Sequence, residues 1–168
     1  LHSDDKSLCV MPLFHVHGLV ASMLSTLASG GTVLVPHGFN PFNFLRISES
    51  QPFTWNTSVP SIHNSILSRA KGNSSAYKLP SLRFIRSCSS ALSPATMSDL
   101  EDLFDVPVLE AYGMTEASHQ MSSNPMPPAV RLAGSVGQAN GIQISIMDEK
   151  GNIKAPKNRG EVVIKGPN

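Results

Sequence analysis

The chain has 168 residues, which is enough for one ordinary domain with a sizeable buried core. Apolar residues make up 40% of the chain and charged residues 15%, which excludes an intrinsically disordered protein. Thirteen basic and twelve acidic residues give a net charge of +1, so the sequence lacks the basic surface of a dedicated nucleic-acid-binding protein. The longest nearly apolar run, residues 19–28, is shorter than the roughly 20 residues that cross a bilayer, so no membrane partner is expected.

The two cysteines, Cys9 and Cys88, are too few for a disulfide framework or a four-ligand zinc site and favour a reducing compartment. The first residue is Leu1 rather than methionine, and the last residues directly follow a strand-like run, which is typical of a piece of a longer protein. We therefore expect a cytoplasmic protein, or a peroxisomal one whose targeting signal lies outside these residues. The oligomeric state is left open.

Strand-like and helix-like segments alternate along the first two thirds of the chain. Strands are predicted at residues 8–13, 32–36, 53–59, 82–86 and 108–112. Helices are predicted at residues 18–29 and 60–70, and two further helices are predicted to begin at residues 41 and 94. A polar loop is predicted at residues 71–75. Asn40 and Ser93 each precede a proline, which is the pattern of an N-cap followed by proline in the first turn of a helix. Phe42 and Leu45 are expected on the buried stripe of the first of these two helices.

This alternation predicts right-handed crossovers and an α/β fold with a mostly parallel sheet and flanking helices. Ligands of such sheets bind beyond the carboxyl ends of the strands, so the segments at residues 14–18, 87–91 and 113–124 are the candidate site loops. Residues 1–124 form the predicted α/β part. In residues 125–168 three prolines mark an irregular crossing, and the period-two runs at 142–148 and 161–165 predict the start of an antiparallel β subdomain.

The segment from Tyr112 to Glu116 follows a buried strand directly. Gly113 allows a tight turn or the close approach of a ligand, and Glu116 offers the hard oxygen that magnesium prefers beside a nucleotide phosphate. An equally supported interpretation is a helix N-terminus with Thr115 as its cap. Neutral hydrogen-bond donors follow a few residues later, at His119, Ser122, Ser123 and Asn124. They could face an anionic ligand, or they could simply cap their own loop.

His15 and His17 are two residues apart, so they share one side of an extended segment. A metal site would need a third ligand, and none lies nearby in the sequence, so a histidine that orients a carboxylate or simply packs in the core is favoured. The small residues at 87–91 would let a flat ring or a carboxylate lie against the backbone, although they also fit a turn before the Ser93 cap. No motif supplies a base that would make Cys88 a nucleophile.

Taken together, these segments resemble the AMP-forming adenylating superfamily, which includes acyl-CoA ligases, peptide-synthetase adenylation domains and firefly luciferase. Residues 14–18 are similar to its aromatic–histidine motif, 89–94 to its small-residue adenine loop, 112–116 to its Tyr-Gly-x-Thr-Glu signature, and 160–167 to its later Gly-Glu-x-x-x-x-Gly-Pro motif. Longer stretches at 55–63, 83–89 and 114–125 are similar to those of the oxalate–CoA ligases of plants and fungi. Ala139, where most relatives have proline, is a departure that leaves the chemistry unaffected.

The resemblance implies a slice of the large N-terminal domain of such a ligase. It implies two half-reactions, in which a carboxylate and ATP give an acyl-adenylate and coenzyme A then gives the acyl-CoA. In this family the phosphate loop would precede Leu1, and the ribose-binding aspartate and catalytic lysine would follow Asn168, so the slice alone is expected to be inactive. The alternatives are a ligase for a fatty acid or a 4-coumarate-like acid, and a non-catalytic AMP-binding module.

The resemblance also implies roles for individual residues. Thr115 and Glu116 are the implied catalytic pair, Thr115 at the phosphate and Glu116 holding Mg²⁺. The implied nucleotide-binding residues are Ser89, Ser90, Ala91, Glu110, Ala111, Tyr112, Gly113, Met114 and Thr115. The implied carboxylate-binding residues are His15, His17, Ser89, His119, Ser122, Ser123 and Asn124.

Overall fold

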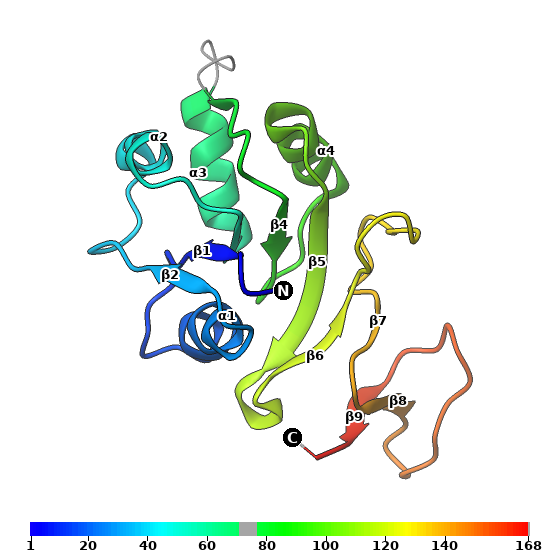
Figure 1. Ribbon diagram of the computed structural model, residues 1–168. Helices are drawn as coiled ribbons and strands as arrows, with labels where there is room; N and C mark the ends of the chain where they lie inside the picture. The colour runs from blue at the N-terminus through cyan, green and yellow to red at the C-terminus, as the bar shows by residue number, and fades with distance from the viewer. Residues whose placement is uncertain (71–76, 168) are drawn as a thin grey trace.

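The computed structural model describes residues 1–70 and 77–167, and the predicted loop at 71–75 lies outside them. Within these residues a seven-stranded sheet has helices on both faces, and a two-stranded sheet stands beside it (Figure 1). The strands are β1 Lys6–Leu8, β2 Thr32–Leu34, β3 Trp55–Ser58, β4 Phe84–Ser87, β5 Val108–Met114, β6 His119–Ser123, β7 Gln138–Ala139, β8 Gln143–Met147 and β9 Glu161–Lys165. The helices are the π-helical η1 His17–Leu24, α1 Ser25–Ala28, α2 Pro41–Ser50, α3 Pro60–Ala70, α4 Pro94–Phe104 and the 3₁₀ turn η3 Thr115–Ala117.

The large sheet has the order β2-β1-β3-β4-β5-β6-β7, and its first five strands are parallel. This confirms the predicted α/β fold with a mostly parallel sheet. The first strand was predicted at residues 8–13, and that position is wrong, because β1 ends at Leu8. The sequence pattern misses it since Lys6 and the fully buried Ser7 interrupt the apolar run on which the prediction rests.

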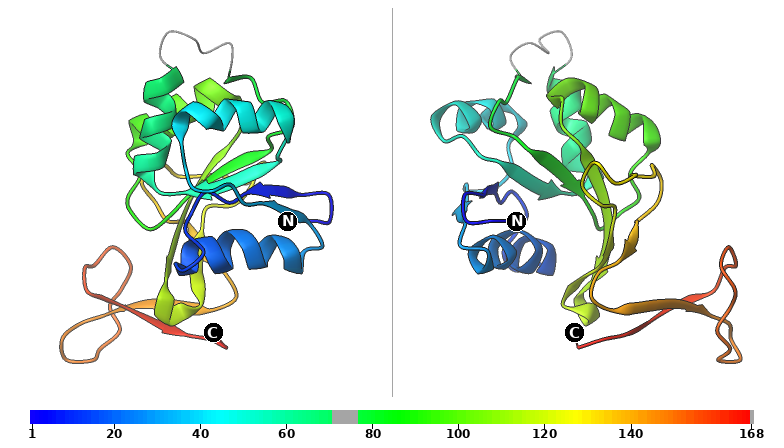
Figure 2. Two further views of the ribbon diagram at one scale, coloured as in Figure 1. Left: turned by 90° about the vertical axis from the view of Figure 1, so that its left-hand side faces the viewer. Right: turned by 45° about the vertical axis from the view of Figure 1, so that its right-hand side comes forward.

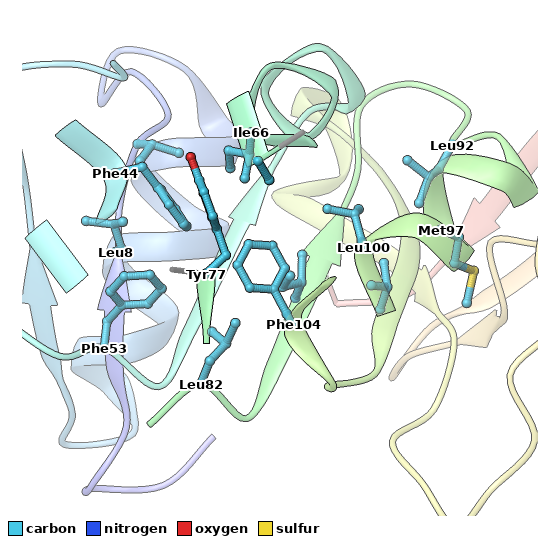
Figure 3. Close-up of a cluster of buried hydrophobic side chains, with 14 residues drawn as sticks. Leu8, Phe44, Phe53, Ile66, Tyr77, Leu82, Leu92, Met97, Leu100 and Phe104 are labelled. Carbon is cyan, nitrogen blue, oxygen red and sulfur yellow. The ribbon is translucent and has the colours of Figure 1, made fainter. Parts of the chain in front are cut away.

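Helices α2, α3 and α4 cover one face of the parallel sheet, and η1 and α1 cover the other (Figures 1 and 2). The main core lies under the three helices, where aromatic and aliphatic side chains from helices and strands interlock (Figure 3). Its buried members include Leu8, Phe44, Phe53, Ile66, Tyr77, Leu82, Ile85, Leu100, Phe104 and Val108. A smaller cluster of Trp55, Phe84 and Leu109 lies apart from this core, with the Trp55 and Phe84 rings stacked at 5.5 Å.

Both predicted helix caps are confirmed. The Asn40 side chain accepts a hydrogen bond from the Phe42 amide at 2.8 Å, and the Ser93 hydroxyl accepts one from the Thr96 amide at 3.0 Å. The buried stripe of α2 was predicted correctly at Leu45, which packs against the core, and wrongly at Phe42, which is 69% exposed while Phe44 is buried instead. Residues 44 and 48 are one turn apart and face the sheet, so Phe42 falls on the outer side, where its ring contacts the Arg69 guanidinium.

The candidate loop at residues 113–124 is in fact a β-hairpin. Strand β5 continues to Met114, the turn η3 reverses the chain, and β6 returns antiparallel with a bulge at Tyr112 and Gly113. The alternative of a helix N-terminus capped by Thr115 is also wrong, since only a three-residue 3₁₀ turn follows. The hairpin extends the sheet well past the ends of its neighbours (Figure 1).

The irregular crossing after Asn124 and the antiparallel pair beyond it are confirmed, with β8 paired to β9 along five residues. Two buried polar side chains of the α/β part hold the crossing. The Asn124 amide accepts from the Leu132 backbone and donates to the Ser135 carbonyl, and the Glu110 carboxylate accepts from the Gly134 backbone at 2.7 Å. Among the helices that the structure describes, none is long and apolar enough to cross a membrane.

Candidate active site

The structure brings two of the three candidate loops together at one side chain. His17, at the start of η1, is fully buried, with its Nδ1 3.0 Å from Ser89 Oγ and its Nε2 2.7 Å from Thr57 Oγ1. Gly18 makes this placement possible, because a Cβ there would overlap the backbone carbonyl oxygen of Pro12. His17 therefore ties the first helix to the end of β3 and to the small-residue loop.

His17 is a neutral residue at physiological pH. Burial, with a smaller contribution from the Arg86 charge, lowers its pKa from 6.5 to about 3. A neutral imidazole donates through one nitrogen and accepts through the other, so its two hydroxyl partners must play opposite parts. Because Thr57 accepts from Arg86, a consistent arrangement has Thr57 donating to Nε2 of His17 and Nδ1–H donating to Ser89.

The hairpin places His119 next to His17, and the centres of the two rings are 5.3 Å apart. His119 is buried in a left-handed backbone conformation with φ +92°, which costs energy for any residue other than glycine. The opposite strand accommodates it only because Gly113 has no side chain, since a Cβ there would overlap the His119 carbonyl oxygen. Gly113 thus permits a close approach of the His119 backbone, whereas the close approach of a ligand that was the alternative to a tight turn stays a prediction.

The His119 ring lies at the cavity with its hydrogen-bonding capacity unused among the described residues. Neither of its nitrogens has a hydrogen-bond partner among the described residues, and burial lowers its pKa to about 4, so it is neutral at physiological pH. A buried polar group without a partner costs roughly 1–3 kcal/mol, so a ligand that pairs with this ring gains from doing so.

Arg86 is the functional candidate that the sequence prediction missed. It lies on β4 with 6% of its surface exposed, and it donates to Thr57 Oγ1 at 3.1 Å and to Gln120 Oε1 at 2.7 Å. Burial lowers the pKa of its guanidinium, and the neighbouring Cys88 thiol opposes that shift. One signal could have identified Arg86 from the sequence: it lies between Ile85 and Ser87 in a predicted strand that has helices on both sides. Charged residues are rarely buried in such a strand without a reason.

Arg86 and His119 line a cavity of about 510 Å³ on the sheet face away from the main core. Strand register puts Trp55, Phe84, Arg86 and Leu109 on that face, and Val20 and Ala21 of η1 and His119, Gln120 and Ser123 of β6 line the other sides. The cavity is apolar along Trp55 and Leu109 and polar where Arg86 and His119 meet it. Such a mixture of an apolar wall and a few converging polar groups is typical of small-molecule sites.

The residues assigned to the nucleotide lie at the rims of the two loops. Ser89, Ser90 and Ala91 are exposed, and Ser89 adopts a left-handed φ of +71°. In the hairpin, Tyr112, Gly113 and Met114 are half-buried, and Thr115 and Glu116 at its tip are exposed. Buried Glu110 and Ala111 lie further back in β5, and desolvation raises the pKa of Glu110. The assignment of these residues to the nucleotide stays a prediction.

The residues assigned to the carboxylate fall into two groups. His17 contacts both Ser89 and His119, but of these three residues only His119 lines the cavity, and His15 is exposed and lies outside it. Ser122 is buried with its hydroxyl unpartnered among the described residues, Ser123 donates to the Asn124 carbonyl, and the Asn124 amide is occupied by the crossing. In the part of the chain that the structure describes, no three histidine, cysteine, aspartate or glutamate side chains gather as a metal site would require.

Comparison with known proteins agrees with this geometry. The family model described as AMP-binding enzyme matches residues 1–168. The oxalate–CoA ligase of Saccharomyces cerevisiae is 49% identical over 98% of this chain and 30% of its own length, and that of Arabidopsis thaliana is 47% identical over 100% of this chain and 33% of its own length. ATP-bound MatB from Rhodopseudomonas palustris superposes with a TM-score of 0.86 at 27% identity, over 99% of this chain and 32% of that structure. The chain therefore spans about a third of these relatives, and it belongs to the AMP-binding enzyme family.

Proposed function

We propose that this chain is the central part of an ATP-dependent carboxylate–CoA ligase, and that the carboxylate is oxalate. In the first half-reaction a carboxylate oxygen attacks the α-phosphorus of ATP, and pyrophosphate leaves. In the second, the thiol of coenzyme A attacks the acyl carbon of the adenylate, and AMP leaves. Family membership supports the reaction class, and the two relatives named oxalate–CoA ligase support the acid.

The observation that carries the substrate proposal is the buried His119 ring at the cavity, with both nitrogens unpartnered among the described residues. Oxalate has no apolar tail, so its second carboxylate must be met by hydrogen-bond donors. A fatty-acid pocket would place aliphatic side chains there, because an unpartnered buried ring nitrogen is unfavourable beside an alkyl chain. The donors near His119 therefore favour a small, doubly charged acid.

The nucleotide would lie across the rims of the two loops. We assign the adenine to the surface formed by Tyr112, Gly113, Ser90 and Ala91, and the phosphates to Thr115. The exposed Glu116 carboxylate is a hard oxygen donor that forms no ion pair among the described residues, so it suits Mg²⁺. When bound, the metal ion offsets phosphate charge, and positioning together with electrostatics supplies most of the rate enhancement.

The buried cysteines agree with a cytoplasmic or peroxisomal enzyme, since Cys9 and Cys88 are both unbridged.

The test of function uses the full-length protein with Mg·ATP and coenzyme A, and oxalate, acetate, octanoate and 4-coumarate are supplied one at a time. AMP and acyl-CoA are quantified by chromatography. We expect the highest kcat/KM with oxalate. Higher activity with octanoate or 4-coumarate would refute the oxalate proposal and leave the reaction class intact, and no AMP with any acid would favour a non-catalytic AMP-binding module.

A further inference from the structure

Two arginines line the cavity, and their charges are in different situations. Arg83 forms an ion pair with the buried Asp5 carboxylate, which also accepts a hydrogen bond from the Thr54 hydroxyl at 2.7 Å. Its positive charge is therefore balanced within the protein. Arg86 lies three residues further along the chain, and among the described residues no carboxylate lies within ion-pair distance of it.

Apart from the neighbouring Cys88 sulfur, whose interaction with the guanidinium favours its charged form, the identified partners of Arg86 are neutral. Its Nη1 donates to Thr57 Oγ1, its Nη2 donates to Gln120 Oε1, and the remaining neighbour is the Cys88 thiol. Each terminal nitrogen of a guanidinium carries a second N–H, so these two bonds leave donors available. A buried charge without a counter-charge is costly, and the cost falls when an anion binds beside it.

His119 cannot supply that charge. The His119 ring is neutral at physiological pH, and a neutral imidazole offers one N–H donor without a net charge. Arg86 is the permanent cation that the described part of the cavity leaves unbalanced, and a guanidinium matches the planar fork of a carboxylate.

We propose that Arg86 provides the counter-charge for the second carboxylate of the substrate, the one that is not adenylated, and thereby selects dianionic over monoanionic acids. This inference rests on the proposed function. Thr57 and Gln120 hold the guanidinium in place through neutral bonds that position it without cancelling its charge, and His119 contributes a hydrogen bond beside it. Arg86 is thus a specificity-determining residue, and the chemistry of attack on ATP stays with the other carboxylate.

The experiment compares oxalate with oxamate, in which a neutral amide replaces one carboxylate at the same size. In the full-length wild-type protein we expect kcat/KM for oxalate to exceed that for oxamate by roughly tenfold or more. Arg86→Gln keeps a hydrogen-bonding group but removes the charge. It should raise KM for oxalate roughly 30-fold or more, bring the two acids within about threefold of each other, and leave KM for ATP within about threefold. Arg86→Lys should restore part of the preference for oxalate.

Arg131→Gln is the matched control. This arginine is half-buried and paired with Glu101 outside the cavity, so its loss should leave the preference unchanged. Equal use of oxalate and oxamate by the wild type would overturn the inference without any variant. So would an Arg86→Gln protein that turns over oxalate and keeps the wild-type preference, or one in which KM for ATP rises as much as KM for oxalate. If the wild type uses no oxalate but turns over another acid, the proposed function fails and takes this inference with it.

Discussion

His17 and Ser89 are 72 positions apart in the chain, yet Nδ1 of the one lies 3.0 Å from Oγ of the other. The bond links the segment that enters η1 with the loop that leaves β4, where Ser89 adopts a left-handed φ of +71°. Since an L-residue pays roughly 1–2 kcal/mol for that conformation, the contact is maintained against local strain.

The strain gives the first prediction. Ser89→Ala loses the hydroxyl and keeps the strained backbone, whereas Ser89→Gly loses the hydroxyl and relieves the strain. We expect the free energy of unfolding of the glycine variant to be about 1 kcal/mol higher than that of the alanine variant. Chemical denaturation measures both values. Ser90, whose φ is not positive, is the control position, and glycine should not exceed alanine there. An alanine variant at 89 as stable as the glycine variant would contradict the account.

The second prediction concerns Glu116. If its carboxylate holds Mg²⁺ against the phosphates, Glu116→Gln lowers the rate of adenylation roughly 10²-fold or more, which corresponds to about 2.7 kcal/mol of transition-state stabilisation. Pyrophosphate release at saturating ATP measures this rate in the full-length protein. Glu149→Gln, an exposed glutamate on the turn after β8, is the control and should match the wild type. A Glu116→Gln rate within threefold of the wild type would remove the metal-binding role.

The third prediction separates binding of the carboxylate from binding of the nucleotide. His119→Ala should raise KM for oxalate roughly tenfold or more and KM for ATP less than threefold, because the ring lines the cavity and not the outer rims. His119→Asn keeps a side-chain donor and tolerates a left-handed backbone, so it should retain more activity than alanine. Parallel increases of both KM values in steady-state kinetics would mean that His119 only supports the hairpin.

The fourth prediction is a pH dependence of stability. The folded-state pKa values of His17, His63 and His119 are lowered to about 3, 4 and 4, against 6.5 in the unfolded chain. Above pH 6.5 these histidines are neutral in both states and contribute nothing. As the pH falls from 6.5 towards 4, only the unfolded chain takes up their protons, so the free energy of unfolding decreases.

At pH 5 this loss is on the order of 1–2 kcal/mol for each buried histidine. Denaturant midpoints at pH 7.5, 6.0 and 5.0 measure it. The pKa of the Asp5 carboxyl is lowered from its usual value of 3.8, so this carboxyl stays ionised between pH 7.5 and pH 5.0 and does not contribute to the change. His63→Gln, a substitution outside the cavity, should reduce the slope by about one third, and a stability that is flat from pH 7.5 to 5.0 would be inconsistent with neutral buried histidines.

The parts of the fold that local signals encode were predictable from the sequence. The caps at Asn40 and Ser93 are decided within four residues, and the apolar stripe of α4 follows its own period. Strand β6 was not predictable as a strand, because its donors, among them His119 and Ser122, show no clear alternation, and it is stabilised by pairing with β5. The burial of Arg86 depends equally on tertiary structure, since η1 and the hairpin must both fold over β4 before its side chain is enclosed.

The three-residue turn η3 has a consequence for changing the substrate range of the proposed ligase by mutation. Because successive residues of a strand face opposite sides, inserting or deleting one residue between Thr115 and Ala117 would shift β6 by one position against β5. A deletion would put Gln120 in the place of His119 and an insertion would put Ser118 there, so the side chains that β6 presents to the cavity would change together. Substitutions on β6 can therefore change the preference for a carboxylic acid one side chain at a time, whereas a change of length at this turn alters all of these side chains at once. Variant libraries should keep the length of the hairpin fixed and vary only its side chains.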